Sequence, residues 1–199
     1  QKPGQLTLDE MVTKGYGGVA CVEAGGPTPG SGCAGRGIIT ALEKLEEMGA
    51  YEVYRPDVII YDVLGDVVCG GFSAPMRDGY ADSVFVITSG ENMAIYAAAN
   101  IAMAIENFRD RGYANLGGII LNRKNVRDED KKVAEFAEES HSSIDGTLDR
   151  SDLVQQAEEM GKTVIEAFPD SDMAAQYRTL AKAVLQAVKG KDEADAQAD

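Results

Sequence analysis

Apolar residues along this chain occur in two arrangements, short continuous runs and longer stretches with helical periodicity. Short runs that end at Gly, Asn or Asp are typical of buried parallel strands. Such runs predict strands at residues 19–23, 58–61, 84–88, 116–121, 142–148 and 164–168. Periodic or capped stretches predict helices at residues 8–11, 38–48, 91–109, 128–139, 152–160 and 171–188, the fourth of them a charged surface helix. This alternation predicts an α/β fold with a largely parallel sheet flanked by helices.

The run at residues 58–61 is followed by a polar, glycine-rich segment. Asp62 and Gly65 form an Asp-x-x-Gly sequence directly after the run, with Asp66 next to it. After a buried strand this pattern is typical of a nucleotide-sensing switch, in which the Asp holds Mg²⁺ or its water and the Gly amide approaches a γ-phosphate. Cys69 follows in the same segment. We therefore predict a loop with a nucleotide at one end and a redox ligand at the other.

The chain has three cysteines and no sign of a disulfide framework. Cys21, between Ala20 and Val22, is expected to be a small buried hydrophobic residue. Cys33 lies in a glycine-rich segment ahead of the helix expected at residues 38–48, whose N-terminal dipole favours a thiolate. Because Cys33 and Cys69 both lie in glycine-rich loops, we interpret them together as candidate metal ligands.

The positions of two further polar residues, Asn122 and His141, can be predicted from their neighbours in the sequence. Asn122 comes directly after a predicted strand, and an Asn at the carboxyl end of a parallel strand is well placed to hydrogen-bond a nucleotide base. An ordinary turn residue is the alternative for Asn122. His141 is the single histidine and is expected at the surface.

Composition limits the class of protein. A chain of 199 residues is long enough for one domain, which we place at residues 1–190, with a disordered acidic tail at 191–199. The net charge of −14 argues against nucleic-acid binding. No apolar run approaches the roughly 18 residues of a membrane span, and no signal peptide is visible. We expect a cytoplasmic protein that does not contact a membrane.

Five longer stretches carry a family resemblance: KGYGGVACVEAGGPTPGSGCAGRG at 14–37, YDVLGDVVCGGFSAP at 61–75, SGENMAIYAAANI at 89–101, LGGIILNRKN at 116–125 and GKTVIEAFPDSDMAAQYRTLAKAV at 161–184. In these the chain resembles the nitrogenase iron protein family, which are ATP-dependent 4Fe-4S reductases with a deviant P-loop NTPase fold. The resemblance extends over about residues 14–188.

The resemblance implies a homodimer with one 4Fe-4S cluster on its two-fold axis. Cys33 and Cys69 of each subunit would supply the four thiolates that such a cluster needs. Arg36 matches the exposed arginine beside the cluster, on the face that docks the electron acceptor, which is an ADP-ribosylation target in some members. The implied acceptor is a larger metalloprotein such as dinitrogenase, and the implied donor is a ferredoxin or flavodoxin.

The resemblance also implies MgATP as a cofactor. Asp62, Gly65 and Asp66 fall on the family's switch, which links the nucleotide state to the cluster and carries the catalytic aspartates. Asn122 matches the asparagine that contacts adenine.

Two departures from the family are visible. The family begins with a strand and a G-x-x-x-x-G-K-S/T loop, and this motif is absent from the sequence. We therefore expect the first strand and P-loop to lie before Gln1, and this polypeptide alone to be inactive in ATP hydrolysis. Near residues 149–151 the family usually has Pro-Arg-Asp, whereas this chain has Asp-Arg-Ser.

Three alternatives remain open at this point. The first is the reductase component of nickel-tetrapyrrole (methanogen coenzyme) biosynthesis, from the same family. The second is a non-redox P-loop carrier or partitioning ATPase, which would not need both Cys33 and Cys69. The third is a structural fragment without activity.

Overall fold

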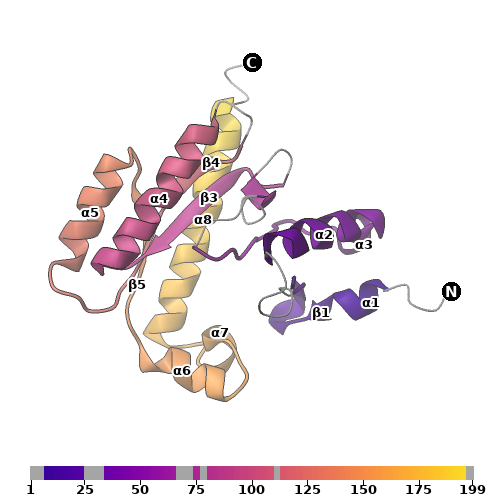
Figure 1. Ribbon diagram of the computed structural model, residues 1–199. Coiled ribbons are helices and arrows are strands. Elements are labelled where there is room, and N and C mark those ends of the chain that lie inside the picture. The colour runs from indigo at the N-terminus through magenta and orange to yellow at the C-terminus, as the bar shows by residue number, and fades with distance from the viewer. Residues whose placement is uncertain (1–6, 25–33, 66–73, 77–79, 110–112, 196–199) are drawn as a thin grey trace. The chain divides into compact units, whose positions relative to one another are not determined.

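The computed structural model describes residues 7–24, 34–65, 74–76, 80–109 and 113–195 (Figure 1). The chain divides into two compact units, residues 1–75 and 76–199. Each unit is described here by itself. The single domain expected at residues 1–190 and the disordered tail at 191–199 stay predictions.

The first unit is built from short elements. Helix α1 (Leu8–Met11) begins after Thr7, whose backbone N–H and hydroxyl both donate to Glu10 Oε2, at 2.7 and 2.8 Å. Strands β1 (Thr13–Lys14) and β2 (Ala20–Cys21) pair antiparallel around the 3-10 turn η1 (Tyr16–Gly18). Helices α2 (Ala34–Glu47) and α3 (Ala50–Tyr54) follow, joined through Gly49 in the left-handed conformation at φ 66°. The 3-10 turn η2 (Ala74–Met76) spans the boundary between the two units in the sequence.

The prediction that Cys21 is buried was wrong. Cys21 is an exposed free thiol in β2. Each of the paired strands β1 and β2 has only two residues, all of them exposed, so this hairpin has no apolar interior in which a thiol could be buried.

The strand expected at residues 58–61 was also wrong. This segment has no regular secondary structure, and Val58, Ile59 and Ile60 are 54%, 45% and 84% exposed. An apolar run becomes a strand only where another strand supplies hydrogen-bond partners, because β-propensity depends on context. In the described part of the chain, no strand pairs with these residues.

The second unit contains the parallel sheet predicted from the sequence. Strands β3 (Ser83–Thr88), β4 (Asn115–Asn122) and β5 (Ile144–Leu148) lie side by side in chain order and are all parallel. Helices α4 (Asn92–Phe108) and α5 (Glu129–Glu139) make the two connections, as parallel strands require. Thr88 lies opposite Leu121, and Asn122 opposite Leu148, so the three strands end at one edge. We call this the carboxyl edge.

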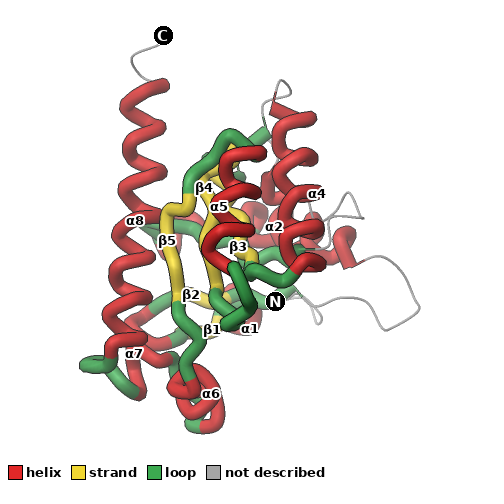
Figure 2. The backbone as a smooth tube through the Cα atoms, turned by 90° about the vertical axis from the view of Figure 1, so that its left-hand side faces the viewer, coloured by secondary structure: helices red, strands yellow, loops and turns green. Residues whose placement is uncertain are grey.

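Helices cover both faces of this sheet (Figure 2). Helices α4 and α5 lie on one face, and α8 (Asp172–Asp195) lies on the other. The core between the sheet and α4 and α5 consists of Val86, Ile119, Leu121, Ala98, Ala102, Ile105, Val133, Phe136 and Ala137. On the opposite face α8 approaches closely, because a Cβ on Gly146 would lie 2.3 Å from Leu180 Cδ1.

A second core cluster joins the end of β5 to helices α6 (Asp152–Glu159), α7 (Val164–Ala167) and α8; it contains Leu148, Ala157, Val164, Met173 and Ala174. The strand expected at residues 164–168 was wrong, since α7 occupies them. Thr163 caps this helix by accepting a hydrogen bond from the Glu166 N–H at 3.2 Å, and Lys162 pairs with Glu166 at 3.5 Å. Capping and packing outweigh the β-propensity of a four-residue apolar run.

Helix α8 is longer than expected. It extends to Asp195 rather than ending near Val188. In the part of the chain that the structure describes, no helix combines the length and the apolar character needed to cross a membrane.

The core predicts a large difference between two leucine substitutions. Leu121 is 1% exposed, whereas Leu185 on α8 is 42% exposed. Leu121→Ala should lower the free energy of unfolding by about 2–5 kcal/mol through lost burial and a cavity, and Leu185→Ala by about 0.5 kcal/mol or less. Urea denaturation of both variants measures this. Equal losses would contradict the position of Leu121 in the core.

Candidate functional site

Three loops of the second unit meet at the carboxyl edge of the sheet. Ser89 and Gly90 follow β3, residues 123–126 follow β4, and residues 149–151 follow β5. The second loop is joined to the end of β5 by a hydrogen bond of 2.9 Å from the Arg123 N–H to the Leu148 carbonyl oxygen. Ligands of open parallel sheets bind at this edge, so it is the first place to look for a site in this unit.

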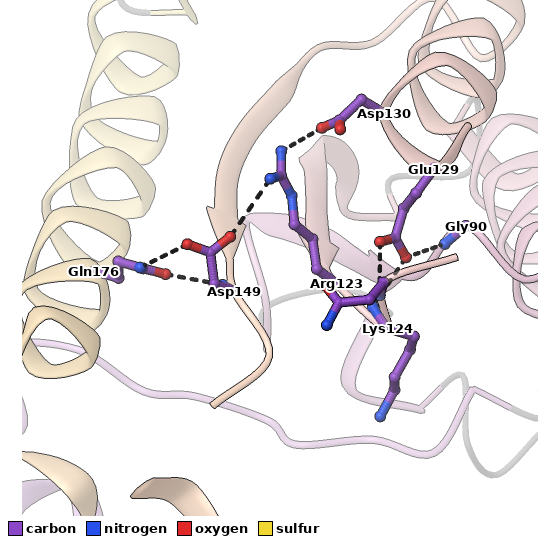
Figure 3. Close-up of polar contacts among 8 residues, drawn as sticks. Gly90, Arg123, Lys124, Glu129, Asp130, Asp149 and Gln176 are labelled. Atoms are coloured by element: carbon purple, nitrogen blue, oxygen red, sulfur yellow. Dashed lines mark hydrogen bonds and ion pairs between the residues drawn. The ribbon is translucent and has the colours of Figure 1, made fainter. Parts of the chain in front are cut away.

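The side chain that organises this edge is Glu129, the first residue of α5. It is only 5% exposed. Its Oε1 accepts hydrogen bonds from the backbone N–H groups of Gly90 at 2.9 Å and Lys124 at 3.0 Å. Its Oε2 accepts one from the Asn125 N–H at 3.1 Å. Figure 3 shows the carboxylate between the Gly90 loop and the chain that follows β4.

The local sequence fits this arrangement. A Cβ on Gly90 would lie 2.6 Å from Glu129 Cγ, so only glycine allows the two segments to approach this closely. The carboxylate is also placed at the N-terminus of α5, where the helix dipole favours a negative charge.

The pKa of Glu129 reflects two opposing effects. Burial raises the pKa of this carboxyl, since desolvation disfavours the charged form. Hydrogen bonds from the backbone amides of Lys124, Gly90, Asn125 and Val126 lower it by more, so the pKa lies below its usual value. The carboxylate is therefore ionised at neutral pH.

An ion-pair network lies beside this carboxylate. The Arg123 guanidinium pairs with Asp130, and its Nη1 lies 3.5 Å from Asp149 Oδ1. Gln176 of α8 holds Asp149 twice: its Oε1 accepts from the Asp149 N–H at 2.8 Å, and its Nε2 donates to Asp149 Oδ2 at 2.9 Å (Figure 3). Asp149 thus ties the ends of β4 and β5 to α8.

Asn122 lies at the end of β4 with its residue exposed. Its side chain makes no hydrogen bond to any other residue that the structure describes, so its amide is available to a ligand. At the loop after β3, Lys132 Nζ lies 3.4 Å from the Gly90 carbonyl oxygen and 3.5 Å from Asn92 Oδ1. An open pocket of about 430 Å³ lies beside it, lined by Glu91, Asn92, Met93, Ala94, Val126 and Lys132.

The other predicted site residues are not brought to this edge by any described contact. Asp62 and Gly65 belong to the first unit and are exposed, in a segment without regular structure. Arg36 lies in the first turn of α2, where the backbone alone is described. Cys33, Asp66 and Cys69 lie outside the described residues. Within the described ranges, no group of three or more His, Cys, Asp or Glu side chains is arranged to hold a metal ion.

Comparison with known families shows which family this chain belongs to. Residues 1–193 match the family described as 4Fe-4S iron sulfur cluster binding proteins, NifH/frxC family. The chain belongs to this family.

Relatives in the NifH/frxC family are similar over most of this chain. The nitrogenase iron protein of Methanospirillum hungatei is 54% identical over 163 residues, which cover 81% of this chain and 57% of that protein. Nitrogenase iron protein 2 of Methanothermobacter thermautotrophicus is 51% identical over 163 residues, covering 81% and 59%. The nitrogenase iron protein of Methanococcus voltae is 45% identical over 164 residues, covering 82% and 59%. The chain thus spans less than two thirds of the length of these curated relatives.

Two solved structures have a fold similar to that of this chain. The cell division ATPase MinD of Pyrococcus furiosus superposes with a TM-score of 0.57 at 15% identity, covering 76% of this chain and 58% of that one. A ParA family ATPase from Chlorobium tepidum gives 0.56 at 16% identity, covering 89% and 67%. At this identity the likeness shows a shared fold, and with the parallel sheet it confirms the α/β class that the sequence predicted.

Sequence reasoning missed two residues of this edge, Glu129 and Arg123. The helix at residues 128–139 was interpreted as a charged surface helix. Its first turn is acidic, so the buried carboxylate in that turn could not be told apart from the exposed ones. Helical spacing carried the signal: Glu129 lies four, seven and eight residues before Val133, Phe136 and Ala137, all of which are buried. Arg123 has no comparable signal, because its partners come from α5 and the loop after β5. His141 was correctly expected at the surface.

The Glu129 carboxylate predicts an acid-sensitive contribution to stability. Because its folded-state pKa lies below the unfolded value of about 4.3, the contribution is complete above that pH and is lost as the pH falls through the folded value. Glu129→Gln should lower the free energy of unfolding by about 1–3 kcal/mol at neutral pH. The difference from the unsubstituted protein should shrink below about pH 4.

Urea denaturation across this pH range measures the effect. Glu138→Gln is the matched control, since Glu138 is an exposed residue on the same helix. A Glu129→Gln deficit that stays constant down to about pH 3 would contradict the assignment of the carboxylate as the titrating group.

Proposed function

We propose that the complete protein is an ATP-dependent one-electron reductase of the nitrogenase iron protein type. By the complete protein we mean a family member of the length of these curated relatives, of which the residues aligned with this chain cover 57–59%. The observation that carries the proposal is the family match over residues 1–193, a range that includes Cys33 and Cys69. The 45–54% identity to proteins named nitrogenase iron protein supports it.

Cys33 and Cys69 are the proposed cluster ligands. Two thiolates from each subunit of a homodimer make four, which is the donor set of a 4Fe-4S cluster. When bound, this cluster would supply one electron at a time to an acceptor metalloprotein such as dinitrogenase, and a ferredoxin or flavodoxin would replace that electron. Arg36, in the first turn of α2, is proposed to lie on the docking face for the acceptor and to be open to ADP-ribosylation.

The nucleotide half of the proposal assigns a role to each of four residues. Asp62, Gly65 and Asp66 are proposed to sense Mg²⁺ and the γ-phosphate of MgATP, with the aspartates as the catalytic residues. Asn122 is proposed to hydrogen-bond the adenine base. Its position at the carboxyl edge and its unpaired side chain among the described residues support that role.

Two other functions remain as candidates. The relatives named above come from Methanospirillum, Methanothermobacter and Methanococcus, which keeps the reductase component of nickel-tetrapyrrole (methanogen coenzyme) biosynthesis as a second candidate within the family. A non-redox carrier or partitioning ATPase would share the fold of MinD and ParA. The presence of a cluster would distinguish the reductases from the carrier ATPase, because a carrier of that kind does not need both Cys33 and Cys69.

Iron and sulfide analysis of the complete protein, purified without oxygen, tests the cluster. We expect about four irons per dimer and, after reduction with dithionite, an EPR signal that changes when MgATP is added. Cys33→Ala and Cys69→Ala should each abolish the signal. Cys21→Ala should leave it unchanged, because Cys21 is exposed and outside the proposed ligand set. A signal that survives loss of Cys33 or Cys69 would refute the ligand assignment, and a protein without iron would favour the carrier ATPase.

Asn122→Ala tests the base contact. We expect the affinity for MgATP to fall by about tenfold, equivalent to roughly 1.4 kcal/mol for the lost amide hydrogen bonds, while the affinity for magnesium tripolyphosphate is unchanged. Isothermal titration calorimetry on the complete protein measures both. Asn107→Ala is the control, since Asn107 is exposed and lies near the C-terminal end of α4. Equal losses for both ligands would contradict a contact to the base.

A further inference from the structure

The two residues that follow Asn122 are held by several contacts, whereas the Asn122 side chain makes no hydrogen bond to any other described residue. Arg123, the next residue, is fixed through its backbone to Leu148 and through its guanidinium to Asp130 and Asp149. The backbone amide of Lys124 is bound by Glu129 Oε1 at 3.0 Å. The direction in which the backbone leaves β4, and with it the placement of Asn122, is therefore set by its neighbours.

This loop has a conformation that needs external support. Asn125 and Asp128 both adopt the left-handed region, with φ of 60° and 56°. Outside glycine this conformation is unfavourable, although less so for Asn and Asp than for other residues, and surrounding contacts help to hold it. Glu129 supplies such a contact, because its Oε2 accepts the Asn125 N–H at 3.1 Å.

The same carboxylate binds a second loop. Its Oε1 accepts the Gly90 N–H at 2.9 Å, across 39 residues of sequence. Gly90 has no room for a Cβ against Glu129, so the two segments are in direct contact. A single buried anion thus fixes the loop after β4 relative to the loop after β3 at the carboxyl edge.

We propose that Glu129 is a positioning residue for recognition of the nucleotide base: by holding the amides of Gly90, Lys124 and Asn125, it fixes the backbone that carries Asn122. This inference rests on the proposed function, in which Asn122 contacts adenine. Glu129 itself touches no ligand in this scheme. Its effect is therefore confined to the base and does not extend to the phosphates.

Nucleotide binding by the Glu129→Gln variant of the complete protein tests the inference. The glutamine keeps the size of the side chain but brings an NH₂ group toward backbone N–H donors, so at least one of the three hydrogen bonds is lost. We expect MgATP affinity to fall by about tenfold, since the base contact depends on the position of Asn122. Magnesium tripolyphosphate affinity should stay unchanged. Glu138→Gln, an equal change on the exposed side of α5, should leave both affinities unchanged.

A double-mutant cycle with Asn122→Ala separates positioning from general stability. If Glu129 acts through Asn122, Glu129→Gln should have no further effect on MgATP affinity once Asn122 is alanine. The same loss in both backgrounds, an equal loss of tripolyphosphate binding, or unchanged MgATP affinity would each overturn the inference. If Glu129→Gln does not fold, Glu129→Asp, which keeps the charge and shortens the side chain, replaces it in the same cycle.

The outcomes also separate this inference from the proposed function. Loss of adenine recognition in Asn122→Ala together with normal binding in Glu129→Gln would overturn the role of Glu129 and leave the proposed function standing. Absence of MgATP binding by the unsubstituted complete protein would overturn the proposed function and the positioning role together.

Discussion

The carboxyl edge of the sheet depends on one buried anion. The Glu129 carboxylate binds backbone amides from two loops that are far apart in the sequence. A buried charge is tolerated only when hydrogen bonds replace its hydration, and here three backbone N–H groups and the N-terminus of α5 do so. The same contacts that stabilise the charge also fix the loops. Stability and the geometry of the candidate site therefore have a common physical origin in this unit.

The sequence predicted the sheet of the second unit correctly, but the strand that it predicted at residues 58–61 of the first unit was wrong. Strands β3, β4 and β5 have neighbours in the described chain, so their apolar runs form a sheet as their pattern predicted. The run at residues 58–61 has the same local pattern, but it belongs to neither sheet of the described chain, and Val58, Ile59 and Ile60 are exposed. Local hydrophobicity predicts where a strand can form, whereas hydrogen-bond partners, which the pattern does not contain, determine whether it forms.

The candidate site was predicted in the same uneven way. The position of Asn122 at a strand end was predicted because a polar residue after an apolar run is a local signal, while its role stays a proposal. Glu129 was overlooked because its neighbours in sequence, Asp128 and Asp130, are exposed and acidic, although its helical spacing to Val133 placed it on the buried face. The role of Arg123 could not be predicted from the local sequence at all, since its partner Asp149 comes from the loop after β5 and is itself held in place by Gln176 of α8.

The proposed reductase must connect a nucleotide to a metal cluster, and the chain limits how that can happen. Asp62 and Cys69 are seven residues apart, so even a fully extended chain between them spans at most about 25 Å. In contrast, Asn122 and the Glu129 contacts belong to the second unit, whose core packs the sheet against α4 and α5. In the proposed function the second unit would thus hold the base in a fixed place, while a displacement of Asp62 toward the γ-phosphate would be carried along this short segment to a cluster ligand. Coupling of this kind requires that the two nucleotide states interact differently with Asp62, because a ligand shifts a conformational equilibrium only through its differential affinity for the two states.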